Sequence, residues 1–128
     1  MSQSKGRILC VDDDHESCAV VTIMLNAEGY EVHSAETISQ ALSLIKSEGF
    51  ILYIIDEKLP DGFGNDLCRK IRERDLQTPI IIHSAAARES DIEAAMEAGA
   101  NGYLIKPHGW ASLQDTVKKL LPQNRSDN

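Results

Sequence analysis

Acidic, hydroxyl and amine side chains follow four of the five short apolar runs in this chain. They are Asp12, Asp13 and Asp14 after the first run, Asp56 after the third, Ser84 just after the fourth and Lys106 after the fifth. Carboxylates that meet in space repel one another, and at about 4 Å with an effective dielectric near 20 one pair costs on the order of 4 kcal/mol. Proton uptake or a bound cation must relieve that repulsion.

This set of groups suits a hard divalent cation together with a phosphoryl group. Oxygen ligands without His or Cys favour Mg²⁺ or Mn²⁺ over zinc. Lys106 can pair with one phosphate oxygen as a point charge, and Ser84 can donate a hydrogen bond to another. Asp56 is then a candidate nucleophile, because carboxylates form acyl-phosphate intermediates.

Each of these residues also has an ordinary structural explanation when it is taken alone. Asp14 precedes a helical pattern and is best explained as a helix N-cap. A single Ser84 would be a turn former, and a single Lys106 would be solvated. One cap needs only one acid, so Asp12 and Asp13 remain for chemistry, and the arrival of the whole set on one edge favours a site.

The elements that must position these groups alternate along residues 7–121. Nearly continuous apolar runs, typical of strands buried on both faces, are found at 8–11, 30–33, 51–55, 79–82 and 103–105. Between and after them, apolar residues recur at helical spacing in five groups: Cys18, Val21 and Leu25; Ile38, Ala41, Leu42 and Ile45; Leu67 and Ile71; Ile92, Ala95, Met96 and Gly99; Leu113, Val117 and Leu120. Capping boxes are predicted at Thr37 with Gln40 and at Ser90 with Glu93.

Five consecutive strand–helix units predict an α/β fold with a doubly wound, five-stranded parallel sheet and helices on both faces. In such a sheet all carboxyl ends share one edge, and ligands bind there. We therefore expect one domain over residues 7–121, a flexible N-terminus at 1–6 and a flexible tail at 122–128.

Composition narrows the class of protein. The 128 residues carry a formal charge of −7, which argues against direct nucleic-acid binding by this segment. No apolar run approaches the roughly 20 residues that span a bilayer, and no secretory signal core is present, so a cytoplasmic protein is expected. The three cysteines Cys10, Cys18 and Cys68 lack a CxxC spacing and are predicted to be small buried hydrophobes.

Four segments together resemble the receiver domain of two-component response regulators, the CheY-like family. They are Ile-Leu-Cys-Val-Asp-Asp-Asp, Ile-Ile-Asp-Glu-Lys-Leu-Pro-Asp-Gly, Ile-Ile-Ile-His-Ser-Ala and Gly-Tyr-Leu-Ile-Lys-Pro, in that order within residues 7–121. No single segment is decisive, but all four at these intervals are specific. The resemblance implies a flavodoxin-like (βα)5 fold with strand order 2-1-3-4-5.

The resemblance also implies a role for each site residue. Asp56 is the expected phosphoacceptor, Asp13 a direct Mg²⁺ ligand with Asp12 acting partly through water, the backbone carbonyl of Lys58 a further ligand, Ser84 the switch hydroxyl, Tyr103 the switch aromatic and Lys106 the phosphate-pairing amine. The peptide between Lys106 and Pro107 is expected to be cis.

The implied activity is a phosphoacceptor switch rather than a turnover enzyme. A phosphohistidine of a sensor kinase or of a phosphotransfer protein would donate the phosphoryl group to Asp56. Ser84 would then move inward and Tyr103 would rotate, which remodels the surface of the fourth helix, fifth strand and fifth helix for a downstream effector.

Three positions depart from the usual family pattern. Glu57 follows Asp56 where an apolar residue is more common, and His108 stands where Phe is frequent. Lys58 is charged, and we hypothesise that its side chain tunes dephosphorylation. His83, beside the switch hydroxyl, is expected to be a packed residue at a strand end.

Other functions remain as alternatives. An aspartyl-phosphate hydrolase usually needs a second Asp two residues after the nucleophile, where this chain has Lys58. A flavodoxin-like electron carrier would place a phosphate beside three acids, which would repel it. A pseudo-receiver that binds partners without phosphorylation is separated from a true receiver by a phosphorylation assay.

Overall fold

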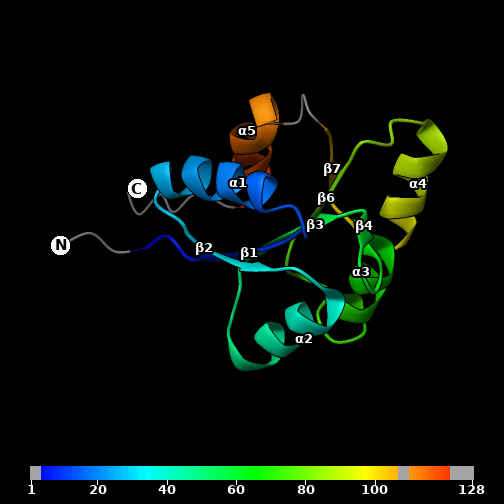
Figure 1. Cartoon of the computed structure of the whole chain (residues 1–128), viewed down its shortest axis with the longest axis horizontal. Helices are drawn as coiled ribbons and strands as arrows, with labels where there is room; N and C mark the ends of the chain where they lie inside the picture. The colour runs from blue at the N-terminus through cyan, green and yellow to red at the C-terminus, as the bar shows by residue number, and fades with distance from the viewer. Residues whose placement is uncertain (1–3, 107–109, 122–128) are drawn as a thin grey trace.

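A computed structural model describes residues 4–106 and 110–121 as a parallel sheet covered by helices on both faces (Figure 1). The predicted tail at 122–128, the peptide before Pro107 and the side chain of His108 lie outside the described residues. Among the residues that are described, no helix is both long enough and apolar enough to cross a membrane.

The central sheet contains five strands in the order β2-β1-β3-β6-β7, and all neighbours are parallel. Their bounds are β1 Arg7–Val11, β2 Glu31–Ala35, β3 Leu52–Asp56, β6 Ile80–Ser84 and β7 Gly102–Ile105. The predicted order 2-1-3-4-5 of the sheet strands is confirmed. The second strand begins one residue later than predicted and extends to Ala35, because it pairs with β1 along its whole length.

The helices form two layers on opposite faces of the sheet. Their bounds are α1 His15–Ala27, α2 Ile38–Ser47, α3 Gly64–Arg72, α4 Glu89–Glu97 and α5 Trp110–Leu120. Helices α1 and α5 lie together on one face, and α2, α3 and α4 lie on the other (Figure 1). This arrangement confirms the doubly wound prediction.

Alternation along each strand divides the core into two clusters. In β1, Ile8 and Cys10 pack beneath α1 and α5, whereas Leu9 and Val11 pack against the helices of the opposite layer. Each fully buried aliphatic side chain contributes roughly 1.5–3 kcal/mol to stability. The three cysteines are buried free thiols, as predicted. The predicted stripe of the fourth helix is only partly buried, because Met96 is 39% exposed.

Helix α2 begins with the Thr37 half of the predicted capping box, whereas the Gln40 side chain accepts the Glu36 N–H at 2.8 Å. The Thr37 hydroxyl accepts a hydrogen bond from the Gln40 backbone N–H at 3.0 Å. A second acceptor comes from a distant turn, where the Asp61 carboxylate accepts the N–H of Ile38 at 2.8 Å. This contact fixes the start of α2 against the segment that follows β3.

The prediction of a capping box at Ser90 and Glu93 is wrong. Helix α4 begins at Glu89, and the Asp91 carboxylate accepts the backbone N–H of Arg88 at 3.2 Å. The pair with the three-residue spacing is Arg88 and Asp91, two positions earlier than predicted. Asp91 therefore accepts the N–H at the N-cap of α4.

Candidate functional site

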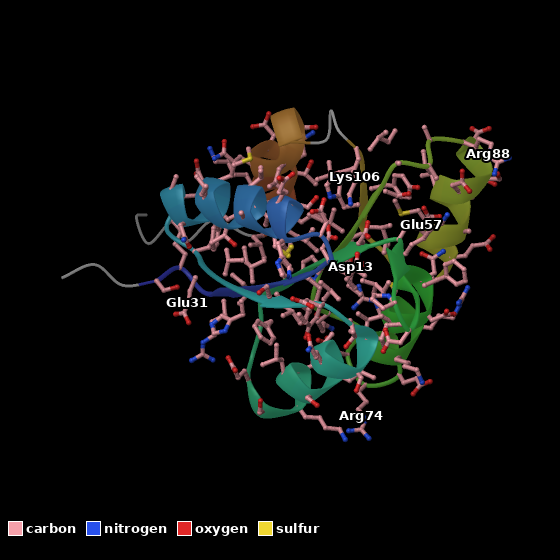
Figure 2. All side chains as sticks on the ribbon, in the orientation of Figure 1. Asp13, Glu31, Glu57, Arg74, Arg88 and Lys106 are labelled. Carbon is pink, nitrogen blue, oxygen red and sulfur yellow. The ribbon has the colours of Figure 1, made fainter. Side chains whose placement is uncertain are left out.

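The carboxyl ends of β1, β3 and β7 bring charged side chains from distant parts of the sequence to one edge of the sheet. Figure 2 shows Asp13, Glu57 and Lys106 at this edge, whereas Glu31 and Arg74 lie on other sides of the molecule. The sheet register places the end of β3 beside the end of β6, with Asp56 opposite His83. The predicted common edge is therefore formed.

Three carboxylates at this edge lie close enough to share one cation. Asp12, Asp13 and Asp56 each offer an oxygen, and these oxygens all lie within 4.8 Å of one another. The donor set is carboxylate oxygen alone, which fits a hard divalent cation better than zinc. The structure thus brings together all three acids that the sequence assigned to metal binding.

Lys106 joins this acidic cluster from β7. Its Nζ lies 3.0 Å from Asp56 Oδ1 and 3.4 Å from Asp12 Oδ2. The lysine therefore bridges the carboxylates that follow the first and third strands. A phosphate oxygen arriving at Asp56 would find this ammonium group already in position.

The three acids after β1 have different roles in the fold. Asp14 is the N-cap of α1 and accepts hydrogen bonds from the Glu16 N–H at 3.1 Å and from the Ser17 hydroxyl at 3.0 Å. Asp12 accepts the Asp14 N–H at 2.9 Å through one oxygen. Asp13 is exposed at the rim. Asp14 thus has the predicted capping role, and its two preceding neighbours face the cluster.

Burial and charge act in opposite directions on these groups. Burial raises the pKa of Asp12 above its ordinary value, and the hydrogen bond from Asp14 and the Lys106 charge only partly offset this. Burial also raises the pKa of Asp56, with a further increase from the Asp12 charge. Burial alone would lower the pKa of Lys106, but its contacts with Asp56 and Asp12 outweigh that effect and raise it. Burial therefore disfavours the charged forms of both carboxylates, and Lys106 favours them.

Two further predicted residues, Ser84 and Tyr103, lie beside this cluster on β6 and β7. The Ser84 hydroxyl is 2.9 Å from the Ala86 N–H, which donates to it. The Tyr103 hydroxyl donates to the Ala86 carbonyl at 2.8 Å. The hydroxyl and the aromatic residue are thus connected through one residue of the loop between β6 and α4.

Comparisons with known proteins agree with this geometry. The family model described as "Response regulator receiver domain" matches residues 8–118. The chain belongs to the response regulator receiver domain family. The fold is thus that of a receiver domain.

Solved structures and curated relatives support the same assignment. A CheY-like receiver domain protein from Methanospirillum hungatei is 33% identical, with 92% of this chain and 93% of that chain covered and a TM-score of 0.83. A putative response regulator from Chloroflexus aurantiacus is 34% identical, with coverages of 92% and 98% and a TM-score of 0.86. The nisin biosynthesis regulatory protein NisR of Lactococcus lactis is 35% identical over 89% of this chain and 48% of its own length. The receiver domain spans about half the length of the curated relatives it matches.

The segment after Asp56 forms a hairpin that the sequence analysis did not predict. Strands β4 (Lys58–Leu59) and β5 (Gly62–Phe63) pair antiparallel and lead directly into α3. Gly64 permits this close return, because a Cβ at that position would overlap the carbonyl oxygen of Asp56. The Lys58 side chain is exposed on this hairpin.

Glu57 is the site residue that sequence reasoning missed. Its carboxylate accepts a hydrogen bond from the Ser84 hydroxyl. The sequence signal was its position, since an acidic residue directly after Asp56 departs from the family pattern. That departure indicated something unusual at the site of this receiver domain without indicating which group it contacts.

Proposed function

We propose that this receiver domain accepts a phosphoryl group on Asp56 from a phosphohistidine of a sensor kinase or a histidine phosphotransfer protein. The observation that carries the proposal is the position of Lys106 Nζ, 3.0 Å from Asp56 Oδ1. Two further carboxylates lie beside this pair in the acidic cluster. An incoming phosphoryl group requires positive charge around its acceptor. Asp56 has both an ammonium group and a candidate cation site beside it.

The cation we propose is Mg²⁺, with Mn²⁺ as an alternative of the same ligand preference. Asp12, Asp13 and Asp56 would hold it, and the backbone carbonyl of Lys58 would supply a further oxygen. When bound, Mg²⁺ offsets the negative charge that develops on the transferring group. The geometry supports this, because one oxygen from each of the three carboxylates lies within 4.8 Å of the others.

The transfer step exchanges one phosphorus bond for another. A carboxylate oxygen of Asp56 forms a bond to phosphorus, and the bond between phosphorus and the donor imidazole nitrogen breaks. The electron pair of that broken bond stays on the imidazole. Lys106 pairs with a phosphoryl oxygen throughout the step, and Ser84 donates a hydrogen bond to another oxygen once the group is in place.

The output of this step is a change at the surface formed by α4, β7 and α5. Tyr103 and Ser84 both contact Ala86 in the loop that leads into α4. Movement of the hydroxyl toward the phosphoryl group would therefore alter the loop and the tyrosine together. We propose that a downstream effector protein or domain recognises this altered surface.

Labelling with a small acyl phosphate tests the proposal. With Mg²⁺, the wild-type chain is expected to gain the mass of one phosphoryl group, and Asp56→Asn is expected to gain none. Asp115→Asn, which neutralises an exposed acid on α5, is the matched control and should label like wild type. Chelation of the metal should abolish labelling. An unlabelled wild type would instead indicate a pseudo-receiver, and release of phosphate without detectable labelling of Asp56 would indicate a hydrolase.

A further inference from the structure

The Ser84 hydroxyl is already engaged by a carboxylate. Its single hydrogen is donated to Glu57 Oε1, and its oxygen accepts the Ala86 N–H at 2.9 Å. A serine hydroxyl has one hydrogen to donate. While Glu57 accepts that hydrogen, Ser84 cannot donate it to a phosphoryl oxygen on Asp56.

The backbone of Glu57 is fixed at both of its polar groups. Its N–H donates to the His83 carbonyl at 3.1 Å, and its carbonyl accepts the Gly64 N–H at 2.7 Å. The residue is partly buried, and Ser84 itself is 1% exposed. The backbone that carries the Glu57 side chain is therefore fixed beside the end of β6, and the hydrogen bond from Ser84 positions the carboxylate.

The contact extends to the aromatic residue of β7. Ala86 donates its N–H to Ser84 and accepts a hydrogen bond from the Tyr103 hydroxyl through its carbonyl at 2.8 Å. Burial raises the pKa of Tyr103, and the Glu57 charge adds to that increase. One chain of contacts thus links Glu57 to Ser84, Ala86 and Tyr103.

We propose that Glu57 is a positioning residue that competes with the phosphoryl group for the Ser84 hydroxyl and thereby weakens the phosphorylated state. The inference rests on the proposed phosphorylation of Asp56. The Glu57 carboxylate and the phosphoryl group on Asp56 would compete as anions for one donor, the Ser84 hydroxyl. Hydrogen bonds to ionised acceptors are shorter and stronger than those to neutral acceptors, so the loss of either bond is costly. Removal of Glu57 frees the hydroxyl for the phosphoryl group.

Binding of fluoroberyllate, a tetrahedral phosphoryl analogue, in the presence of Mg²⁺ measures this competition. Glu57→Ala is expected to lower the dissociation constant about tenfold, the low end for loss of a competing hydrogen bond to a charged group. Glu57→Gln retains an oxygen acceptor without charge and is expected to fall between wild type and Glu57→Ala. Glu93→Ala removes an exposed acid from α4 and should bind like wild type.

A double-mutant cycle separates the hydrogen bond from simple charge repulsion. In a Ser84→Ala background, Glu57→Ala is expected to change the dissociation constant by less than about twofold, because no hydroxyl remains to compete for. Equal tightening in both backgrounds would overturn the competition and leave only a charge effect. Wild type that does not bind fluoroberyllate at all would overturn the proposed phosphorylation, and this inference with it.

A second readout uses the free protein without metal or anion. The backbone amide resonance of Ala86 and the ring resonances of Tyr103 are expected to shift in Glu57→Ala and to shift less in Glu57→Gln. Resonances that stay at their wild-type positions in both variants would show that Glu57 does not hold Ser84, whatever the anion affinity does.

Discussion

Polar side chains gather at both edges of the sheet, where the strands begin and where they end. The charged groups at the two edges differ in the partners that they have. At the carboxyl edge, Asp12 and Asp56 share one ammonium group, that of Lys106. At the amino edge, where α3 leads into β6 and α4 leads into β7, one guanidinium group meets several oxygen acceptors. At the first edge one cation faces two carboxylates, and at the second one cation donates to neutral oxygens.

Arg72 is the centre of the amino edge. Its Nε donates to the Gly99 carbonyl at 3.0 Å, and its Nη1 donates to the carbonyls of Asp75 at 2.9 Å and Thr78 at 2.8 Å. Its Nη2 donates to the Asn101 side-chain oxygen at 2.8 Å. One side chain thus ties the end of α3 to the starts of β6 and β7.

The carboxylates at the two edges have pKa values shifted in opposite directions. Burial raises the pKa of Asp75, but hydrogen bonds from Thr78 and Gln77 outweigh burial and leave it below the ordinary value of 3.8. Burial dominates for Asp12 and Asp56, whose pKa values are raised. The Asp75 carboxylate is thus stabilised by hydrogen bonds within the amino edge, whereas burial outweighs the stabilising contacts of Asp12 and Asp56 at the carboxyl edge.

The largest expected effect comes from removal of the arginine at the amino edge. Arg72→Ala leaves several acceptors without their donor and is expected to lower the free energy of unfolding by about 3 kcal/mol. Urea denaturation measures this. Arg69→Ala, on the same helix but in an exposed ion pair with Asp66, is the matched control and should cost less than about 1 kcal/mol. Equal losses in the two variants would refute the structural role of Arg72.

The carboxyl edge was largely predictable from sequence, and the amino edge was not. Asp12, Asp56 and Lys106 follow predicted strands, and parallel strands end at one edge whatever their side chains do in detail. Arg72 reaches Asn101, 29 residues away, through a choice of side-chain rotamer that no local pattern encodes.

Residues near the site escaped prediction for related reasons. The contact of Glu57 with Ser84 depends on the β3–β6 register and on a hairpin of two-residue strands. Such short strands carry too few residues for an alternating pattern. The cap of α4 was misplaced because Ser90 is a favoured N-cap residue, whereas the observed N-cap, Arg88, has no side-chain acceptor and is not signalled by its residue type.

A smaller effect is expected on the pH dependence of stability, to which His83 contributes at the carboxyl edge. His83 is 1% exposed, and burial, with the nearby Lys106 charge, lowers its pKa to about 4. In the unfolded chain the pKa of this histidine is near 6.5. The free energy that the neutral side chain contributes to stability is fully present above pH 6.5 and is lost as the pH falls from 6.5 toward 4. At pH 5 the loss is about 2 kcal/mol. The pKa of Asp75 is lowered, so the stability that this carboxylate contributes is lost only at lower pH, as the pH falls through and below its ordinary value of 3.8.

Unfolding in urea at pH 7 and at pH 5 tests the contribution of His83. Wild type is expected to lose more stability between these two values than His83→Gln does, because glutamine takes up no proton in this range. The carboxylates of the acidic cluster titrate in both proteins, so their contribution cancels in the difference. Identical losses in the two proteins would show that His83 is not the acid-sensitive group.

The smallest expected effect compares an Asp→Asn substitution at each edge. The two substitutions are expected to change the free energy of unfolding in opposite directions. In metal-free buffer at pH 7, Asp56→Asn is expected to raise the free energy of unfolding by about 1 kcal/mol, because it relieves repulsion in the acidic cluster. Asp75→Asn is expected to lower it by about 1 kcal/mol, because a charged acceptor of the Thr78 hydrogen bonds is lost. Mg²⁺ should stabilise wild type and Asp75→Asn but have a weaker effect on Asp56→Asn, since a ligand present only in the folded state adds to its stability. Destabilisation by both substitutions would mean that the Lys106 ion pair outweighs repulsion, and that the carboxyl edge is as satisfied as the amino edge.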